Sequence, residues 1–241
     1  MHPSRFFIFA IIFFCAVGKV FAFPFGFPGT DPDHIPKDPF KKEYYTVNSC
    51  FLTYNGKFVD LATPAANYEK AYELIAQTPT GRLLLKKYKT LNAKDPFQYK
   101  ELNYSLRREL NMPVKIGAAF IFQGKEKTIY YDPEDNIGLL AIFLSHELMH
   151  AVDPDVLDTY FKEMDAWKQL PREDYERLHQ QNSFRIERRA FDMQDIILIE
   201  LLKLTPCYGS FIQQHRDEGG LKLFNPTPDS YIRDAYGIAA P

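Results

Sequence analysis

IGLLAIFLSHELMHAV, residues 137–152, carries only four polar side chains, those of Ser145, His146, Glu147 and His150. A helix that is apolar around its whole circumference belongs in a protein core. The preceding residues 132–135, DPED, offer an acidic N-cap and a proline for the first turn. Pro154 ends the helix, because the residue before a proline is disfavoured in the α region. We therefore predict a buried helix over residues 137–152.

The polar side chains of this helix have the spacing of a metal site. His146 and His150 are one turn apart, about 6 Å along the axis, and project from the same face. Two neutral imidazole nitrogens at that separation can bind one zinc ion at about 2.0–2.1 Å. Glu147 points to the side of the pair, where it can take a proton from a water that zinc has acidified to a pKa of about 7. The alternative is two core histidines satisfied by neighbouring groups.

These residues form an HExxH motif, and LSHELMHAV, residues 144–152, resembles the longer pattern of the zincin metallopeptidases. The resemblance covers residues 114–204. It implies one zinc ion bound by His146 and His150, with Glu147 as the general base. It also implies hydrolysis of peptide bonds in a peptide or protein substrate.

The HExxH motif does not itself identify the third zinc ligand. The metzincin extension is absent, because Asp153 stands where that branch has Gly and Val156 where it has the third His. The resemblance therefore implies the gluzincin-like branch, in which a glutamate on a later helix completes the site. The expected helix is 182–204, and ERRAF, residues 187–191, is similar to the Glu-x-x-Ala stretch around that ligand. This makes Glu187 the candidate, with Glu163, Asp165 and His179 as the alternatives.

Two acidic residues are candidates for supporting the metal ligands. Phe191 stands where the commonest version of the family pattern has Asp, and Asp192 follows it. Asp153, at the end of the first helix, could hold one of the histidines. For Glu187 itself, the competing interpretation is an exposed acid in a surface ion-pair network.

The composition is that of an ordinary globular protein and does not resemble that of a nucleic-acid-binding protein. The chain has 241 residues, 46% hydrophobic and 25% charged, with a formal net charge of −2. No basic stripe is present that could neutralise a phosphate backbone. One domain, residues 44–241, is expected at this length.

The amino-terminal residues predict export. Residues 1–22 resemble a signal peptide, with Arg5 before a short apolar run and small residues before a cleavage position after Ala22. Residues 23–43 form a proline-rich arm or linker. We expect a secreted or periplasmic protein with no integral membrane segment after cleavage. Removal of Cys15 leaves Cys50 and Cys207, for which we predict a disulfide.

The remaining pattern predicts a helix-rich α+β domain with a small antiparallel sheet or hairpins beside the metal-binding helix. We expect a hairpin over residues 50–61 around an Asn-Gly turn. Helices are expected at 68–76, 81–91, 96–110 and over most of 133–205, and strands at 114–122 and 128–131. By the resemblance, one of those strands, at 118–121 or 128–131, could pair with an extended substrate.

Two other functions are compatible with the sequence. The chain could be an inactive or weakly active zincin-fold binding module, although a purely structural metal site needs no base at Glu147. It could also be a metal-dependent amide hydrolase acting on a non-protein substrate.

Overall fold

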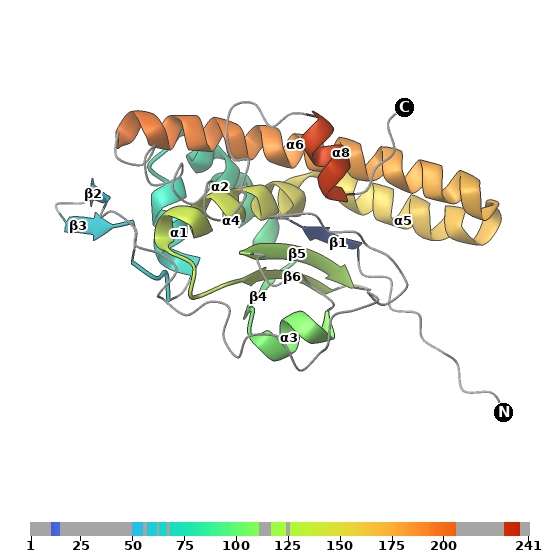
Figure 1. Ribbon diagram of the computed structural model, residues 1–241, viewed down its shortest axis with the longest axis horizontal. Coiled ribbons are helices and arrows are strands. Elements are labelled where there is room, and N and C mark those ends of the chain that lie inside the picture. Colours follow the sequence, from blue (N-terminus) through green and yellow to red (C-terminus); the bar gives the residue numbers. More distant parts are fainter. Residues whose placement is uncertain are drawn as a thin grey trace.

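The computed structural model describes residues 11–14, 50–54, 57–61, 63–66, 68–110, 117–123, 126–205 and 229–236. These residues form a helix-rich α+β structure in which most helices lie on one side of a small mixed sheet and the short helix α3 (Tyr104–Glu109) lies on the other (Figure 1). The predicted arm, residues 23–43, lies outside the described residues.

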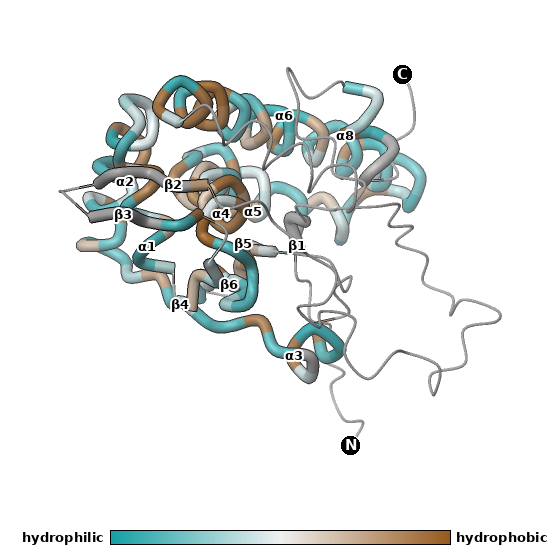
Figure 2. The backbone as a smooth tube through the Cα atoms, turned by 60° about the vertical axis from the view of Figure 1, so that its left-hand side comes forward, coloured by the Kyte–Doolittle hydropathy of each residue, from teal (hydrophilic) through white to brown (hydrophobic). Residues whose placement is uncertain are grey.

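Helix α4 (Ile137–Val152) lies at the centre of the molecule and has the predicted limits. It is the most continuously apolar helix in Figure 2 and is surrounded there by other elements. Its N-cap is Asn136, whose side chain accepts a hydrogen bond from the Leu139 N–H. The expectation of an acidic cap within residues 132–135 is therefore wrong. The helix ends as predicted, because Asp153 before Pro154 has extended backbone angles.

Among the helices that the structure describes, three pack against α4. Helices α1 (Tyr68–Ile75) and α2 (Pro79–Asn92) pack against it, as does the long helix α6 (Arg172–Leu204). Helix α5 (Pro154–Gln169) follows α4 directly and forms an antiparallel pair with α6, visible along the upper edge of Figure 1. The short helix α8 (Asp229–Tyr236) packs on α6.

The sheet has the strand order β1-β5-β6-β4. Strands β5 (Ala118–Gln123) and β6 (Glu126–Tyr131) form the predicted antiparallel pair, and α4 packs against both. Strand β1 (Ile11–Phe14), which lies within the predicted signal peptide, pairs antiparallel with the other edge of β5. Strands β2 (Phe51–Tyr54) and β3 (Lys57–Asp60) form a separate antiparallel pair, which confirms the predicted hairpin; Asn55 and Gly56 lie outside the described residues.

Two expectations about this region are wrong. Residues 96–110 are not one helix: Gln98–Glu101 form strand β4, and helix α3 covers only Tyr104–Glu109. The alternation of buried Phe97, exposed Gln98 and half-buried Tyr99 suits a strand, and the Asn103 side chain caps α3. Strand β4 pairs in parallel with β6, so the sheet is mixed rather than antiparallel.

Cys50 is buried and disulfide-bonded. Its sulfur lies 3.9 Å from Oγ1 of Thr205, which is two residues before Cys207 in the sequence. Cys207 and Cys15 lie outside the described residues. The pairing of Cys50 with Cys207 stays a prediction, and the contact with Thr205 supports it.

None of the helices in the described part of the chain has the length and apolar composition needed to cross a bilayer.

Candidate metal centre

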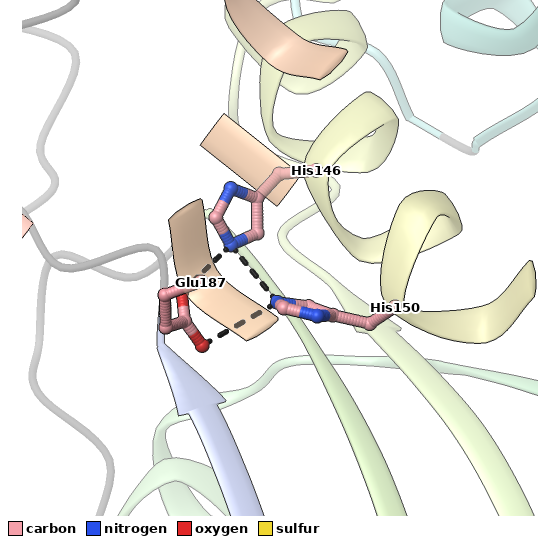
Figure 3. Close-up of side chains that lie close together, drawn as sticks. All are labelled: His146, His150 and Glu187. Carbon is pink, nitrogen blue, oxygen red and sulfur yellow. Dashed lines mark hydrogen bonds and ion pairs between the residues drawn. The ribbon is translucent and has the colours of Figure 1, made fainter. Parts of the chain in front are cut away.

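Three buried side chains from two packed helices converge on one point (Figure 3). His146 and His150 come from successive turns of α4, and Glu187 comes from α6. The two Nε2 atoms are 3.0 Å apart. Oε2 of Glu187 lies 3.2 Å from Nε2 of His146, and Oε1 lies 3.5 Å from Nε2 of His150. The helical spacing of the histidines and the packing of α4 against α6 therefore bring together the three predicted ligands.

The separations of these atoms fit one bound metal ion. Ligand atoms held at about 2.0–2.1 Å from a tetrahedral ion lie roughly 3.3 Å from one another. The three observed separations, 3.0, 3.2 and 3.5 Å, lie on either side of that value. Among the described residues, this is the one group of three or more His, Cys, Asp or Glu side chains close enough to share an ion. It can bind a metal ion through two nitrogens and a carboxylate.

Polar atoms without hydrogen-bond partners give a second reason to place an ion here. Within the described residues, Oε1 of Glu147 and Oε1 of Glu187 are buried and accept no hydrogen bond. Such atoms are costly in a core. A core cluster in which two histidines are satisfied by their neighbours would not leave two carboxylate oxygens without partners, so the structure favours a ligand over a purely structural cluster.

Glu147 lies beside the three converging groups but is held by the sheet. Its Oε2 accepts a hydrogen bond from the main-chain N–H of Phe120 on β5, at 2.7 Å. Burial raises the pKa of Glu147 well above its ordinary value, the nearby Glu187 raises it further, and the bond from Phe120 opposes the shift. A carboxylate with a raised pKa is a stronger proton acceptor than an ordinary carboxylate.

The protonation of His150 also suits a metal ligand. Burial lowers the pKa of His150 well below its ordinary value, and His146 and Arg189 lower it further. The imidazole is therefore neutral at neutral pH, which is the form that binds metal ions.

Glu187 is buried, with 1% of its surface exposed, which excludes the interpretation that it is a surface acid. The alternative third ligands lie elsewhere. Glu163 accepts hydrogen bonds from His179 and from Asn182, at 2.8 and 2.9 Å. Asp165 is exposed and faces Lys168.

The two acids expected to support the ligands have other partners. Asp192 is half-exposed and forms an ion pair with Arg188. Asp153 caps α5 by accepting a hydrogen bond from the Asp155 N–H, and it forms an ion pair with Arg189. Their support of the metal ligands stays a prediction.

Phe191 occupies the space beside the first histidine. Its ring meets the His146 ring edge to face, with centroids 4.5 Å apart. An aromatic ring thus packs against the imidazole at the position where a carboxylate was the commoner expectation. Nδ1 of His146 has no hydrogen-bond partner among the described residues, which is consistent with a phenylalanine in place of a carboxylate.

Sequence reasoning missed two features of the site. The hydrogen bond from Phe120 to Glu147 uses a main-chain group, which no residue pattern reports. Helix α8 packs beside the site, where Tyr231 contacts Phe191 and Asp229 pairs with Arg188. This helix is separated from α6 by residues 205–228, so only tertiary structure places it.

Comparisons with known proteins give no relative for the chain: no protein-family model, no curated protein and no solved structure matches it. The site therefore rests on its own geometry.

Proposed function

We propose that the protein is an exported zinc metallopeptidase of the zincin type, with His146, His150 and Glu187 as the zinc ligands. The observation that carries the proposal is the convergence of these three buried groups beside Glu147. Two histidines and one glutamate are a known ligand set of catalytic zinc, in which the fourth position is left for water or substrate. Structural zinc sites are instead closed by four protein ligands.

A zinc ion bound by these residues would supply Lewis acidity and a low pKa for the attacking water. Glu147 is the group of this chain that accepts the proton of that water and returns it to the leaving amine. Its Oε2 is fixed by the Phe120 N–H, while Oε1 has no hydrogen-bond partner among the described residues. A carboxylate held in this way presents one oxygen for proton transfer.

Strand β5 is the proposed binding edge for an extended substrate. One of its edges pairs with β6, and the other pairs with β1, which belongs to the predicted signal peptide. Removal of residues 1–22 would leave main-chain groups of β5 available for pairing with a peptide. The bond from Phe120 to Glu147 places this strand directly beside the proposed base.

One observation favours a second candidate, a zincin-fold binding module with weak or no activity. Phe191 packs against His146 where a supporting carboxylate was expected. Loss of such support typically reduces metal affinity or activity by about 10–100-fold. Glu147 argues for the enzyme, since a structural metal site needs no buried acid next to its ligands.

The experiment is a comparison of mature wild-type protein, residues 23–241, with Glu147→Gln. Both are purified, metal is measured by elemental analysis, and both are loaded with zinc before incubation with a mixed peptide library. The proposal predicts one zinc per chain in both proteins and new peptide ends only with the wild type. Zinc binding without cleavage by either protein would favour the binding module, and absence of zinc from both would reject the metal site.

A further inference from the structure

Helices α5 and α6 are joined by a series of polar contacts as well as by apolar packing. Farthest from α4, Glu163 bonds His179 and Asn182. Closer to α4, Thr159 accepts a hydrogen bond from Arg185, and Asp155 forms an ion pair with Arg189. The α5 members, at 155, 159 and 163, are one turn apart, so these contacts follow a single face of α5.

The last of these contacts also reaches α4. The Arg189 guanidinium pairs with two carboxylates, with Nε 2.7 Å from Oδ2 of Asp153 and an Nη atom 2.8 Å from Oδ2 of Asp155. Asp153 is the corner between the helices: its N–H bonds the Met149 carbonyl at the end of α4, and its side chain caps α5. Its side chain is 5% exposed, so its charge is shielded from water and depends on Arg189.

We propose that Arg189 is a positioning residue for the metal site, which fixes Glu187 in register with the two histidines. The inference rests on the proposed function, because it concerns the same three ligands. Glu187 and Arg189 are two residues apart on α6, and His150 and Asp153 are three residues apart at the end of α4. The ion pair between Arg189 and Asp153 therefore joins the two helices close to the point where their ligands meet.

The geometry favours an extended cation. The Nη1 atom of Arg189 donates a hydrogen bond to Asp155, whereas its Nε forms an ion pair with Asp153 without a hydrogen bond. A planar guanidinium can lie against two carboxylates at once, whereas an ammonium group acts as a point charge. Asp153 and Asp155 would repel each other across the corner without a shared partner. Arg189 holds both acids and so fixes the corner as well as the distance between α4 and α6.

Arg185 provides a matched control within the same helix. It lies two residues before Glu187, as Arg189 lies two residues after it, and it also bonds α5, through Thr159. Within the described residues, its hydrogen bonds go to Thr159 and Asn182 and do not reach the corner at Asp153. Arg185→Gln therefore removes an arginine that is equally far from Glu187 in the sequence and that also contacts α5. It leaves the ion pair between Arg189 and Asp153 at the end of α4 intact.

The test measures zinc affinity by competition with a chromophoric chelator, for the mature wild type and for Arg189→Gln, Arg189→Lys and Arg185→Gln. The expected loss of affinity for Arg189→Gln is about 10–100-fold, as for other groups that orient metal ligands. Arg189→Lys should lose less, and Arg185→Gln should stay within about 3-fold of wild type. The thermal stability of each metal-free protein is measured alongside. If Arg189 only stabilised the fold, Arg189→Gln and Arg185→Gln would both lower the melting temperature and would bind zinc with similar affinity.

Asp155→Asn covers the case in which Arg189→Gln does not fold. Asp155 is half-exposed, so this change removes one of the two carboxylates with little disturbance of the core, and a smaller loss of zinc affinity is expected. Wild-type affinity in both Arg189→Gln and Asp155→Asn, or an equal loss in Arg185→Gln, would overturn the inference and leave the metal site standing. Failure of the wild type to bind zinc would overturn the proposed function and the inference together.

Discussion

Oε2 of Glu147 accepts a hydrogen bond from the main-chain N–H of Phe120, at 2.7 Å, and this bond ties the buried helix α4 to strand β5. The N–H comes from the backbone, so any residue other than proline at position 120 can supply it. The bond leaves Oε1 without a partner among the described residues. The acid next to the ligands is thus oriented by the sheet before any substrate is bound.

The first prediction concerns the stability of the metal-free protein with Glu147→Gln. Burial raises the pKa of Glu147 above its ordinary value of 4.5, so the folded state binds a proton that the unfolded state releases. Glu147 therefore lowers the free energy of unfolding progressively as the pH rises above 4.5. Glutamine has no such cost and can still accept the bond from Phe120. We expect the variant to melt at a higher temperature at pH 7, by about 2–4 °C for each 1 kcal/mol removed.

The pH dependence provides the check. The difference in melting temperature between Glu147→Gln and wild type, both treated with a chelator, should decrease toward pH 4.5, where the unfolded chain is protonated as well. A variant that is less stable than wild type at pH 7 would show that the carboxyl group is compensated in the fold, and would contradict the prediction.

The sequence was sufficient to place α4 and the first two ligands. The apolar circumference of residues 137–152 requires burial, and the i, i+4 spacing of His146 and His150 puts both rings on one face whatever the tertiary structure. Glu187 was harder to predict as a ligand, because the residues that share its face of α6 include both apolar and polar side chains. Only the packing of α4 against α6 shows that this face is turned toward the histidines.

The features that could not be predicted from the sequence depend on contacts between elements that are distant in the chain. Strand β4 replaces part of the helix expected over residues 96–110, because parallel pairing with β6 overrides the local preference of residues 98–101. The ion pairs of Arg189 join residues more than thirty positions apart, and no pattern within one helix reports them.

The second prediction separates ligands from their neighbours. His146→Ala, His150→Ala and Glu187→Ala should each lose bound zinc, because two remaining protein ligands hold the ion poorly. Glu163→Gln is the control, since Glu163 is a buried acid bonded to His179 and Asn182 instead. It should keep one zinc per chain by elemental analysis. Full zinc occupancy in Glu187→Ala would show that the third ligand is misassigned.

The third prediction concerns pH and the histidine His150. Burial lowers the pKa of His150 below its ordinary value of 6.5, so as the pH falls below 6.5 the unfolded chain takes up a proton that the folded chain does not. The metal-free protein should therefore lose stability on acidification through this range. His150→Gln should flatten that part of the curve of melting temperature against pH. An unchanged slope in the variant would assign the loss of stability to other groups.

The fourth prediction is the pairing of the cysteines. Cys50 is disulfide-bonded and contacts Thr205, so we expect its partner to be Cys207. Mass spectrometry of the secreted protein after non-reducing digestion should find one peptide that joins the two. Cys50→Ala should lower the free energy of unfolding by about 2–4 kcal/mol. Free, alkylatable Cys50 in protein recovered from an oxidising medium would refute the pairing.

The fifth prediction is that export removes residues 1–22 and frees one edge of β5. In the full chain, Ile11–Phe14 pair with residues 119–122 of β5, and those four residues lie inside the predicted signal peptide. N-terminal sequencing of the secreted protein should begin at Phe23. Strand β5 keeps its pairing with β6 and its packing against α4, so protein expressed as residues 23–241 should fold without β1. It should cleave peptides faster than the full chain, because β1 no longer competes with the substrate for the edge. A secreted protein that retains Arg5, or a truncated chain that fails to fold, would show that β1 belongs to the working structure.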